Sequence, residues 1–282
     1  MQQRHLFDDV WRCLPMSATH ALIEIDCEGL CAIGKPRLTT SECLALRYIP
    51  IGVSVGFGIA MIRYGPIISL LPFIVLIGFG QLGGLCGAAH LRTMGALWTL
   101  KHSLWLRGVT AYTFAGMLSS LATGSILGLA GAIAPSSSKP IMFGTVALMG
   151  IASLLRETGL LVFAIPERHC QTLRNWAYEY GWVGACAMWG FHIGVAFSTV
   201  ITFASFWVLV AFIVALGRAD AGAVLMGAYW IGRCLPLWLL APLASRTETW
   251  SITQLAPLLR PAHVVALGWF VGVALLTEFG YR

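Results

Sequence analysis

The sequence predicts an all-α, polytopic bundle of membrane-spanning helices. Hydrophobic residues make up 58% of the 282 positions and charged residues only 11%, and the mean hydropathy is +0.79. Soluble domains carry about 25% charged residues, so this chain lacks the polar surface that a soluble fold of its length needs. Long apolar runs recur along the chain, and about 20 apolar residues suffice for a helix to cross the hydrocarbon core. We therefore expect the lipid bilayer to be the chain's solvent.

Residues 1–46 are predicted to be a soluble cytosolic segment, followed by a transmembrane helical domain at 47–282. The segment mixes acidic residues and His5 with short apolar patches, so we expect no cleavable signal peptide. It carries half of the eight cysteines. Cys27 and Cys31 are spaced C-x3-C, whereas structural zinc sites usually begin C-x2-C and need four ligands. No metal site and no cofactor are therefore expected.

The apolar runs predict about eight spans. One run, at 183–216, is too long for a single helix and suffices for two if the chain turns near 198–205. Seven spans are the alternative, if 183–216 forms one tilted helix. The runs lie at 48–62, 66–86, 108–134, 141–165, 183–216, 221–243 and 263–276.

The distribution of lysine and arginine predicts the orientation. With eight spans and the N-terminus inside, the cytoplasmic segments hold thirteen basic residues and the outer loops four. Such an excess on one side is typical of cytoplasmic loops, so both termini are expected in the cytoplasm. Because the basic residues are spread over short loops, the net charge of +6 indicates membrane orientation and not a nucleic-acid partner.

Arg233 is the most informative single residue, because a charge at mid-membrane costs roughly 2.5 to 3.5 kcal/mol on insertion scales. Tyr229 precedes it by one helical turn and is expected on the same helix face. Pro236 leaves the carbonyl of Gly232 without its usual donor, so this carbonyl becomes an available acceptor. Two interpretations stay open: a structural arginine that satisfies a broken helix, or a contact to an anion or substrate.

His192 and Cys234 are the other candidate functional residues. An imidazole at membrane depth can shuttle protons, and it can equally well hydrogen-bond a neighbouring helix. Cys234 is the cysteine expected deepest in the membrane, but the sequence pairs it with no second thiol, so an inert buried thiol is the simpler interpretation. No Walker loop, G-x-S-x-G, H-E-x-x-H or paired-carboxylate motif is present, so we do not expect an enzyme.

Two further features concern packing. Gly124 and Gly128 repeat at the four-residue spacing that lets membrane helices approach closely. Glu157 directly follows Arg156 at the end of the run 141–165, where an interfacial ion pair is expected.

Three segments carry a resemblance to a known family. They are LLRETGLLVFAIPERHCQTLRNWAYEYGW at 154–182, GFHIGVAF at 190–197 and YWIGRCLP at 229–236. Together they resemble the CcdA/DsbD-type transmembrane superfamily over residues 106–245. The cysteine-bearing leader and the two extra helices before this core look most like the MauF family of methylamine utilization membrane proteins.

This resemblance implies a multi-pass protein of the bacterial inner membrane. Its expected role is in the biogenesis (export, processing or disulfide maturation) of a periplasmic enzyme, the small subunit of methylamine dehydrogenase. Expected partners are that subunit and other methylamine-utilization maturation proteins. Electron-carrying relatives place a cysteine beside a proline in two helices, whereas this chain reads Ala134-Pro135-Ser136 at the first such place. A small-solute transporter and a thiol-disulfide electron conduit remain alternatives.

Overall fold

The computed structural model describes residues 66–81, 85–165, 176–196, 201, 203–244 and 256–280, and every regular element within them is helical. The predicted all-α fold is therefore confirmed for this part of the chain. The leader at 1–46 and the predicted span at 48–62 lie outside the described residues. The elements are α5 (Pro66–Gly80), α6 (Leu85–Leu100), α7 (His102–Ala132), the short 3-10 helix η3 (Ser136–Ser138), α8 (Lys139–Glu157), α9 (Trp176–Glu179), α10 (Gly181–Gly194), α11 (Ser205–Leu216), α12 (Ala219–Leu239), α13 (Ala241–Ala244) and α14 (Ala256–Gly280).

Most predicted runs correspond to helices, with one correction. The run 183–216 is divided into α10 and α11 with an interruption after residue 194, near the predicted turn. The predicted runs left residues 87–107 as a connection between two spans, whereas α6 occupies most of them, so this segment is helical and not a loop. Polar residues lower the hydropathy there, but the hydroxyls of Thr93 and Thr99 donate to carbonyls of their own helix, at 2.9 Å each. A helix can therefore carry them without exposing unsatisfied polar atoms.

Helix α8 ends earlier than its apolar run, which continues to residue 165. Gly159 has a φ of 80° and its N–H donates to the carbonyl of Arg156. This left-handed glycine ends the helix in the usual way for a helix C-terminus, although the following residues stay apolar. Hydropathy alone could not predict this end.

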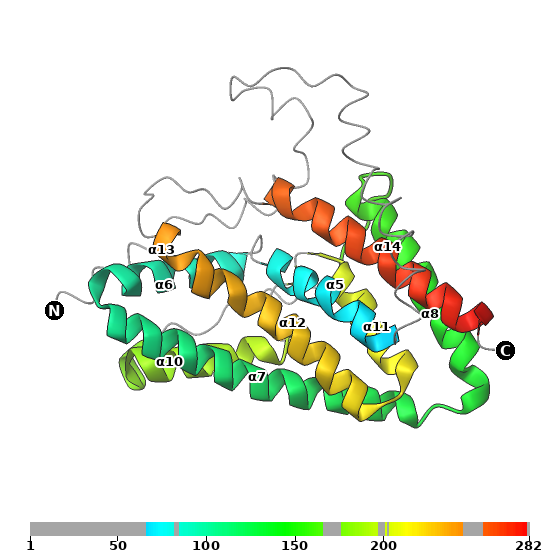
Figure 1. The fold of residues 1–282 in the computed structure, drawn as a ribbon, viewed down its shortest axis with the longest axis horizontal. Coiled ribbons are helices and arrows are strands. Elements are labelled where there is room, and N and C mark those ends of the chain that lie inside the picture. Colours follow the sequence, from blue (N-terminus) through cyan, green and yellow to red (C-terminus); the bar gives the residue numbers. More distant parts are fainter. Residues whose placement is uncertain are drawn as a thin grey trace, which may run out of the picture.

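Helices α7 and α12 lie side by side along the long axis of the molecule (Figure 1). A Cβ on Gly124 would overlap the carbonyl of Gly222, and one on Gly128 would overlap that of Arg218. Towards the other end of α7, Gly116 lies against Trp230. The two helices are therefore antiparallel, and the predicted close approach at Gly124 and Gly128 is confirmed.

Helices α10 and α11 run along α7 in the same direction as α7. Gly190 of α10 approaches the carbonyl of Tyr112, and the Ser120 hydroxyl donates to the carbonyl of Gly194 at 2.8 Å. Further along, Gly131 approaches the carbonyl of Val214 near the end of α11. Higher residue numbers on α7 therefore meet higher numbers on the α10 and α11 pair.

Helices α5 and α6 return in the opposite direction. The ring of His90 on α6 lies 5.6 Å from that of Tyr112 on α7, and Trp98 lies 4.5 Å from Trp105. Helix α5 packs between α12 and α14 and runs antiparallel to α14 (Figure 1). The two helices of each pair, α5 with α6 and α10 with α11, therefore run in the same direction along α7, and we call these two pairs the interrupted helices.

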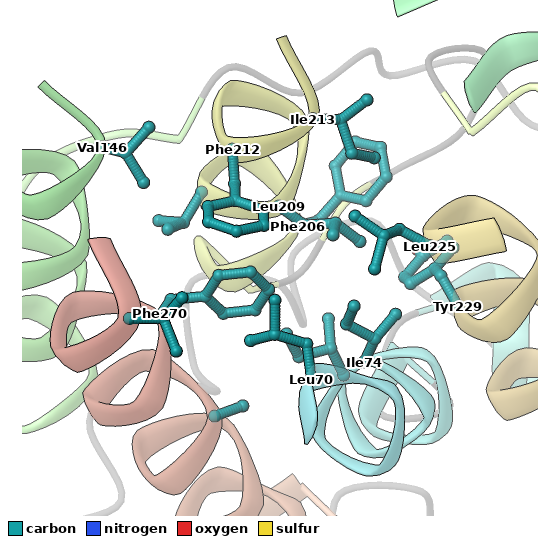
Figure 2. Close-up of a cluster of buried hydrophobic side chains, with 14 of the residues drawn as sticks. Leu70, Ile74, Val146, Phe206, Leu209, Phe212, Ile213, Leu225, Tyr229 and Phe270 are labelled. Atoms are coloured by element: carbon teal, nitrogen blue, oxygen red, sulfur yellow. The ribbon is translucent and has the colours of Figure 1, made fainter. Parts of the chain in front are cut away.

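Two hydrophobic clusters fill the bundle. The Phe cluster packs between α5, α8, α11, α12 and α14, around Phe143, Phe206, Phe212 and Phe270. Figure 2 shows the last three of these rings within the cluster. The Trp cluster packs between α6, α7, α10, α12 and α13, around Trp105, Trp189 and Trp230. Helix α12 contributes to both clusters, so the two parts of the bundle meet on this helix.

Helix α7 buries Trp105, Val109 and Tyr112 near its start, but its other buried residues are small, and it exposes large apolar ones. Two described helices are long and apolar enough to cross a membrane, His102–Ala132 and Ser136–Glu157, and only 33% and 28% of their most apolar windows is buried. The small residues that α7 buries are Gly108, Gly116, Ser119, Ser120, Gly124, Gly128 and Gly131. The large apolar residues that it exposes are Leu106, Phe114, Leu118, Ile126 and Leu129.

Candidate functional site

Arg233 lies inside the bundle, on α12, with only 8% of its surface exposed. Its Nη1 donates a hydrogen bond to the hydroxyl of Tyr229 at 3.0 Å, and its guanidinium carbon lies 5.8 Å from the centre of that ring. Tyr229 is fully buried and packs on Phe206 of the Phe cluster, with ring centres 5.2 Å apart. The predicted sharing of one helix face by Tyr229 and Arg233 is therefore confirmed.

Close backbone contact encloses this pair. A Cβ on Gly78 of α5 would overlap the carbonyl of Tyr229, and one on Gly232 would overlap the carbonyl of Val75. Only glycine permits this approach of α5 and α12, because any side chain would separate the two backbones. The glycines thus place the α5 backbone directly beside the buried arginine.

A small cavity, about the size of one water molecule, lies beside the guanidinium. Gln81 follows α5 at its interruption, and Ile193 lies in the last turn of α10. The cavity therefore touches both interrupted helices. Four polar side chains line it, and no carboxylate is among the described lining residues, which are Gly78, Gln81, Gly87, His90, Tyr112, Ile193, Arg233 and Leu237.

Pro236 is buried within α12, which continues through it to Leu239. The N–H of Leu240 donates to the carbonyl of Pro236 at 2.8 Å, so hydrogen bonding resumes directly after the ring. The sequence predicted that the carbonyl of Gly232 would be an available acceptor for Arg233. The structure shows a phenol acceptor for the guanidinium, the hydroxyl of Tyr229, and the role of the Gly232 carbonyl stays a prediction.

Cys234 belongs to the Trp cluster and is buried. Its thiol shares a hydrogen bond with the side chain of Thr113, whose Oγ1 also accepts from the indole N–H of Trp238 at 3.0 Å. The indole N–H of Trp230 donates to the Thr113 carbonyl at 2.8 Å. Cys186, the other cysteine whose side chain the structure describes, is also buried and free. Cys186 and Cys234 are therefore packed side chains of the Trp cluster.

His192 does not join the arginine site. Its ring meets Trp176 edge to face at 5.9 Å, and the neighbouring Ile193, not His192, lines the cavity. Of the five candidate residues, the structure brings Tyr229 and Arg233 into contact, places Cys234 and Pro236 on the same buried helix segment, and leaves His192 against an aromatic side chain.

A second polar group, which sequence reasoning missed, lies at the interruption before α11. The hydroxyl of Ser205 and Nδ1 of His263 are 2.6 Å apart, and both residues are fully buried. The His263 ring stacks on Phe203 at 3.7 Å. Ser205 and His263 are 58 residues apart in sequence. Ser205 ended the predicted turn within the run 183–216 and His263 began the last run, so no local pattern connected them.

Glu157 lies near the same interruption and is 4% exposed. Its Oε1 accepts from Arg156 at 2.8 Å and from the backbone N–H of Ala204 at 3.4 Å. The predicted ion pair of Arg156 and Glu157 is confirmed. The carboxylate also binds the backbone just before α11, which the sequence did not indicate. Within the part of the chain that the structure describes, no three His, Cys, Asp or Glu side chains are grouped to hold a metal ion.

The fold and the site define a helical bundle with a buried arginine between interrupted helices. No protein-family model matches the chain, and neither a curated protein nor a solved structure matches it.

Proposed function

We propose that this chain is an integral membrane protein. The observation that carries the proposal is the distribution of residue sizes on α7 after Thr113. All buried residues of this part are glycine or serine, whereas its exposed residues include Phe114, Leu118, Ile126 and Leu129. A soluble protein buries its large apolar residues, because water disfavours their exposure. In lipid there is no such drive, and small residues line helix contacts so that backbones can approach.

Within the membrane, we propose seven crossings in place of eight, with α10 and α11 forming one interrupted crossing. Lys139, at the start of α8, donates from Nζ to the carbonyls of Ala215 and Leu216 at the end of α11, at 3.2 and 2.8 Å. The α7–α8 turn and the α11–α12 turn therefore share one side. Seven crossings also need α5 and α6 to form one interrupted crossing, in agreement with their common direction along α7.

The basic residues fit seven crossings as well as eight. With the N-terminus inside, Arg246 and Arg260 become cytoplasmic, while Arg218 and Arg282 become external. Arg92 then lies within the crossing of α5 and α6, so the count becomes twelve to four. The excess on one side is nearly unchanged, so the positive-inside rule does not distinguish the two topologies. Seven crossings place the C-terminus outside.

Fusions of a phosphatase that is active only in the periplasm test the topology. Active fusions after Ser137 and Asp220, with a silent fusion after Tyr178, are the expected result. A silent fusion after Asp220 would favour eight spans instead. The fusion after Ser137 is external in both topologies and controls for expression.

For the role of the protein, we propose support for the maturation of a periplasmic enzyme, the small subunit of methylamine dehydrogenase. The protein would act in the bacterial inner membrane together with other methylamine-utilization proteins. The support is the family resemblance, whose YWIGRCLP segment supplies the buried pair of Tyr229 and Arg233. Buried, free Cys186 and Cys234 favour assistance over a dithiol electron conduit.

A deletion strain grown with methylamine tests this role. A small secreted subunit depends on its disulfides, each contributing about 2 to 4 kcal/mol, so a subunit that is exported late or oxidised wrongly would be degraded. An immunoblot of the periplasm should show loss of the small subunit while its transcript persists. Normal subunit levels with full amine-oxidising activity would exclude the maturation role.

A small-solute transporter is the second candidate, favoured by the polar cavity that touches both interrupted helices. Transporters commonly place substrate sites where membrane helices are interrupted. A deletion strain with normal enzyme but slow methylamine uptake would support this function over maturation.

A further inference from the structure

We propose that the apolar segment 160–163, directly after α8, inserts into the lipid interface on the cytoplasmic side of the bilayer. We call it the anchor segment. The proposal rests on the membrane location proposed above and adds to it an interaction surface and its partner, the headgroup region of a lipid leaflet. The seven-crossing and the eight-crossing topologies both place the end of α8 on the cytoplasmic side, so the side is the same in both.

The anchor segment exposes four consecutive large apolar side chains. The exposed fractions are 67% for Leu160, 43% for Leu161, 88% for Val162 and 37% for Phe163. Exposed apolar patches usually mark contact with a membrane or with another protein, because water disfavours them. Helix α8 also exposes Leu148 and Ile151, so apolar exposure extends along the chain from the middle of α8 into the segment. Since this face of α8 meets lipid in the proposed membrane location, lipid is the occupant that the continuity favours.

Hydrogen bonds tie the anchor segment to the last turn of α8 at both of its ends. The N–H groups of Leu160 and Leu161 both donate to the carbonyl of Leu155, at 2.8 and 3.1 Å. At the other end, Nε of Arg156 donates to the carbonyl of Phe163 at 3.0 Å, and the guanidinium carbon lies 5.7 Å from the centre of that ring. The segment therefore folds back beside the end of α8 and does not extend freely into water.

The charged end of α8 sets the depth of the segment. Helix α8 has 19 residues and is about 28 Å long, nearly the thickness of the hydrocarbon core. The ion pair of Arg156 and Glu157 closes the helix, and arginine at the end of a membrane helix reaches the interface, where its charge stays hydrated.

The backbone of the segment gives the same depth. Residues 161–165 form no helix or strand, and irregular backbone that faces lipid does not occur within the hydrocarbon core, where its polar groups would lack partners. At the interface, water and headgroups supply those partners, while the apolar side chains reach the outer part of the acyl chains. This is the arrangement of a segment that lies on the membrane and does not span it.

A fluorescent amino acid at position 162 tests the proposal. The full-length protein carries Anap in place of Val162, or in place of Leu148 as the control, which lies in the middle of α8 and is 69% exposed. Both proteins are placed in nanodiscs of phosphatidylcholine that is brominated either near the glycerol end or near the tip of its acyl chains. We expect quenching at Val162 to be at least twofold stronger from the shallow bromines, and quenching at Leu148 to be at least twofold stronger from the deep ones. The silent phosphatase fusion after Tyr178 tests the side.

The two positions separate failure of the anchor from failure of the membrane location. Quenching at Leu148 without quenching at Val162 would place the segment in water or beneath protein, and would overturn the anchor alone. Stronger quenching at Val162 from the deep bromines would mean that the chain stays in the hydrocarbon core, and this also overturns the anchor. Absence of quenching at both positions would overturn the membrane location together with the anchor. If the Val162 variant does not fold, Leu160 carries the fluorophore in the same segment, with the same expected result.

Discussion

The Phe cluster and the Trp cluster are both hydrophobic, but they are held together differently. In the Phe cluster, Phe212 meets Phe143 and Phe270 edge to face, with ring centres 6.0 and 5.4 Å apart. In the Trp cluster, two indole N–H groups converge on Thr113, and a free thiol lies beside it. The first cluster therefore depends on shape and volume, whereas the second also depends on directed hydrogen bonds.

The difference matches where each cluster lies along the bundle. Trp98, His102 and Trp105 contact one another where α6 meets α7, next to exposed Lys101. Tryptophan combines an apolar body with a polar N–H, and it is enriched where membranes meet water. The Phe cluster packs around α5, α11 and α14, next to the buried pair of Ser205 and His263. The comparison suggests that volume changes damage one part of the protein and loss of hydrogen-bonding groups damages the other.

The largest effect should come from the contact of α7 with α12, on which both clusters depend. Gly124→Leu puts a branched side chain where even a Cβ would overlap the carbonyl of Gly222. We expect a loss of at least about 4 kcal/mol and no folded protein by gel filtration in detergent. Gly272→Leu is the control, because a Cβ at Gly272 meets nothing within 4 Å. Equal accumulation of the two variants would refute the packing assigned to α7 and α12.

Phe212→Ala should damage the Phe cluster alone. Removal of a fully packed ring leaves a cavity and lowers the free energy of unfolding by about 3 to 5 kcal/mol. Thermal unfolding in detergent measures this loss. Phe114→Ala is the matched control, since Phe114 on α7 is 68% exposed. If both variants lose stability equally, the Phe cluster is not the packed core described above.

Arg233→Leu should lower the stability and function of the protein more than Cys234→Ser does, although the two residues are adjacent. The leucine variant leaves the buried Tyr229 hydroxyl without its donor, at a cost of about 1 to 3 kcal/mol. Serine nearly preserves the volume of the thiol and can still hydrogen-bond Thr113. Yield of folded protein and complementation of a deletion strain give the two readouts. A dead Cys234→Ser beside a normal Arg233→Leu would favour a thiol mechanism.

The smallest loss of stability is expected from a variant that removes hydrogen bonds of the Trp cluster. Thr113→Val keeps the shape but removes the acceptor of Trp238 and the partner of Cys234. We expect a loss of about 1 kcal/mol in thermal unfolding. Thr145→Val is the control, because the Thr145 hydroxyl is exposed and bonds only within its own helix. No difference between the two variants would mean that the Trp cluster, like the Phe cluster, depends on volume alone.

The sequence predicted those features that depend on neighbours along the chain. Tyr229 and Arg233 are four residues apart, so helical periodicity was enough to place them on one face. The helix α7 and the interruption before α11 followed from hydropathy and length. Helix α6 was missed because Arg92 and Lys101 made its segment resemble a polar loop.

Features that join distant segments could not be predicted. The Ser205 and His263 pair, the cavity lining from five helices and the contact of Lys139 with α11 all require the packed structure. His192 and Arg233 were both chosen because they are polar within apolar runs. Hydropathy does not specify how each helix is rotated about its own axis. This rotation places His192 against Trp176 and Arg233 at the cavity.

The glycine face of α7 has a consequence for the order in which the protein assembles. Gly124 meets Gly222, which the ribosome adds about 100 residues later. At a synthesis rate of about 5 to 20 residues per second, α7 spends roughly 5 to 20 seconds without its partner. In the proposed membrane topology, lipid chains occupy the groove during that interval, and they must leave when α12 arrives. A smooth glycine surface holds lipid by few contacts, so the late helix can displace it quickly.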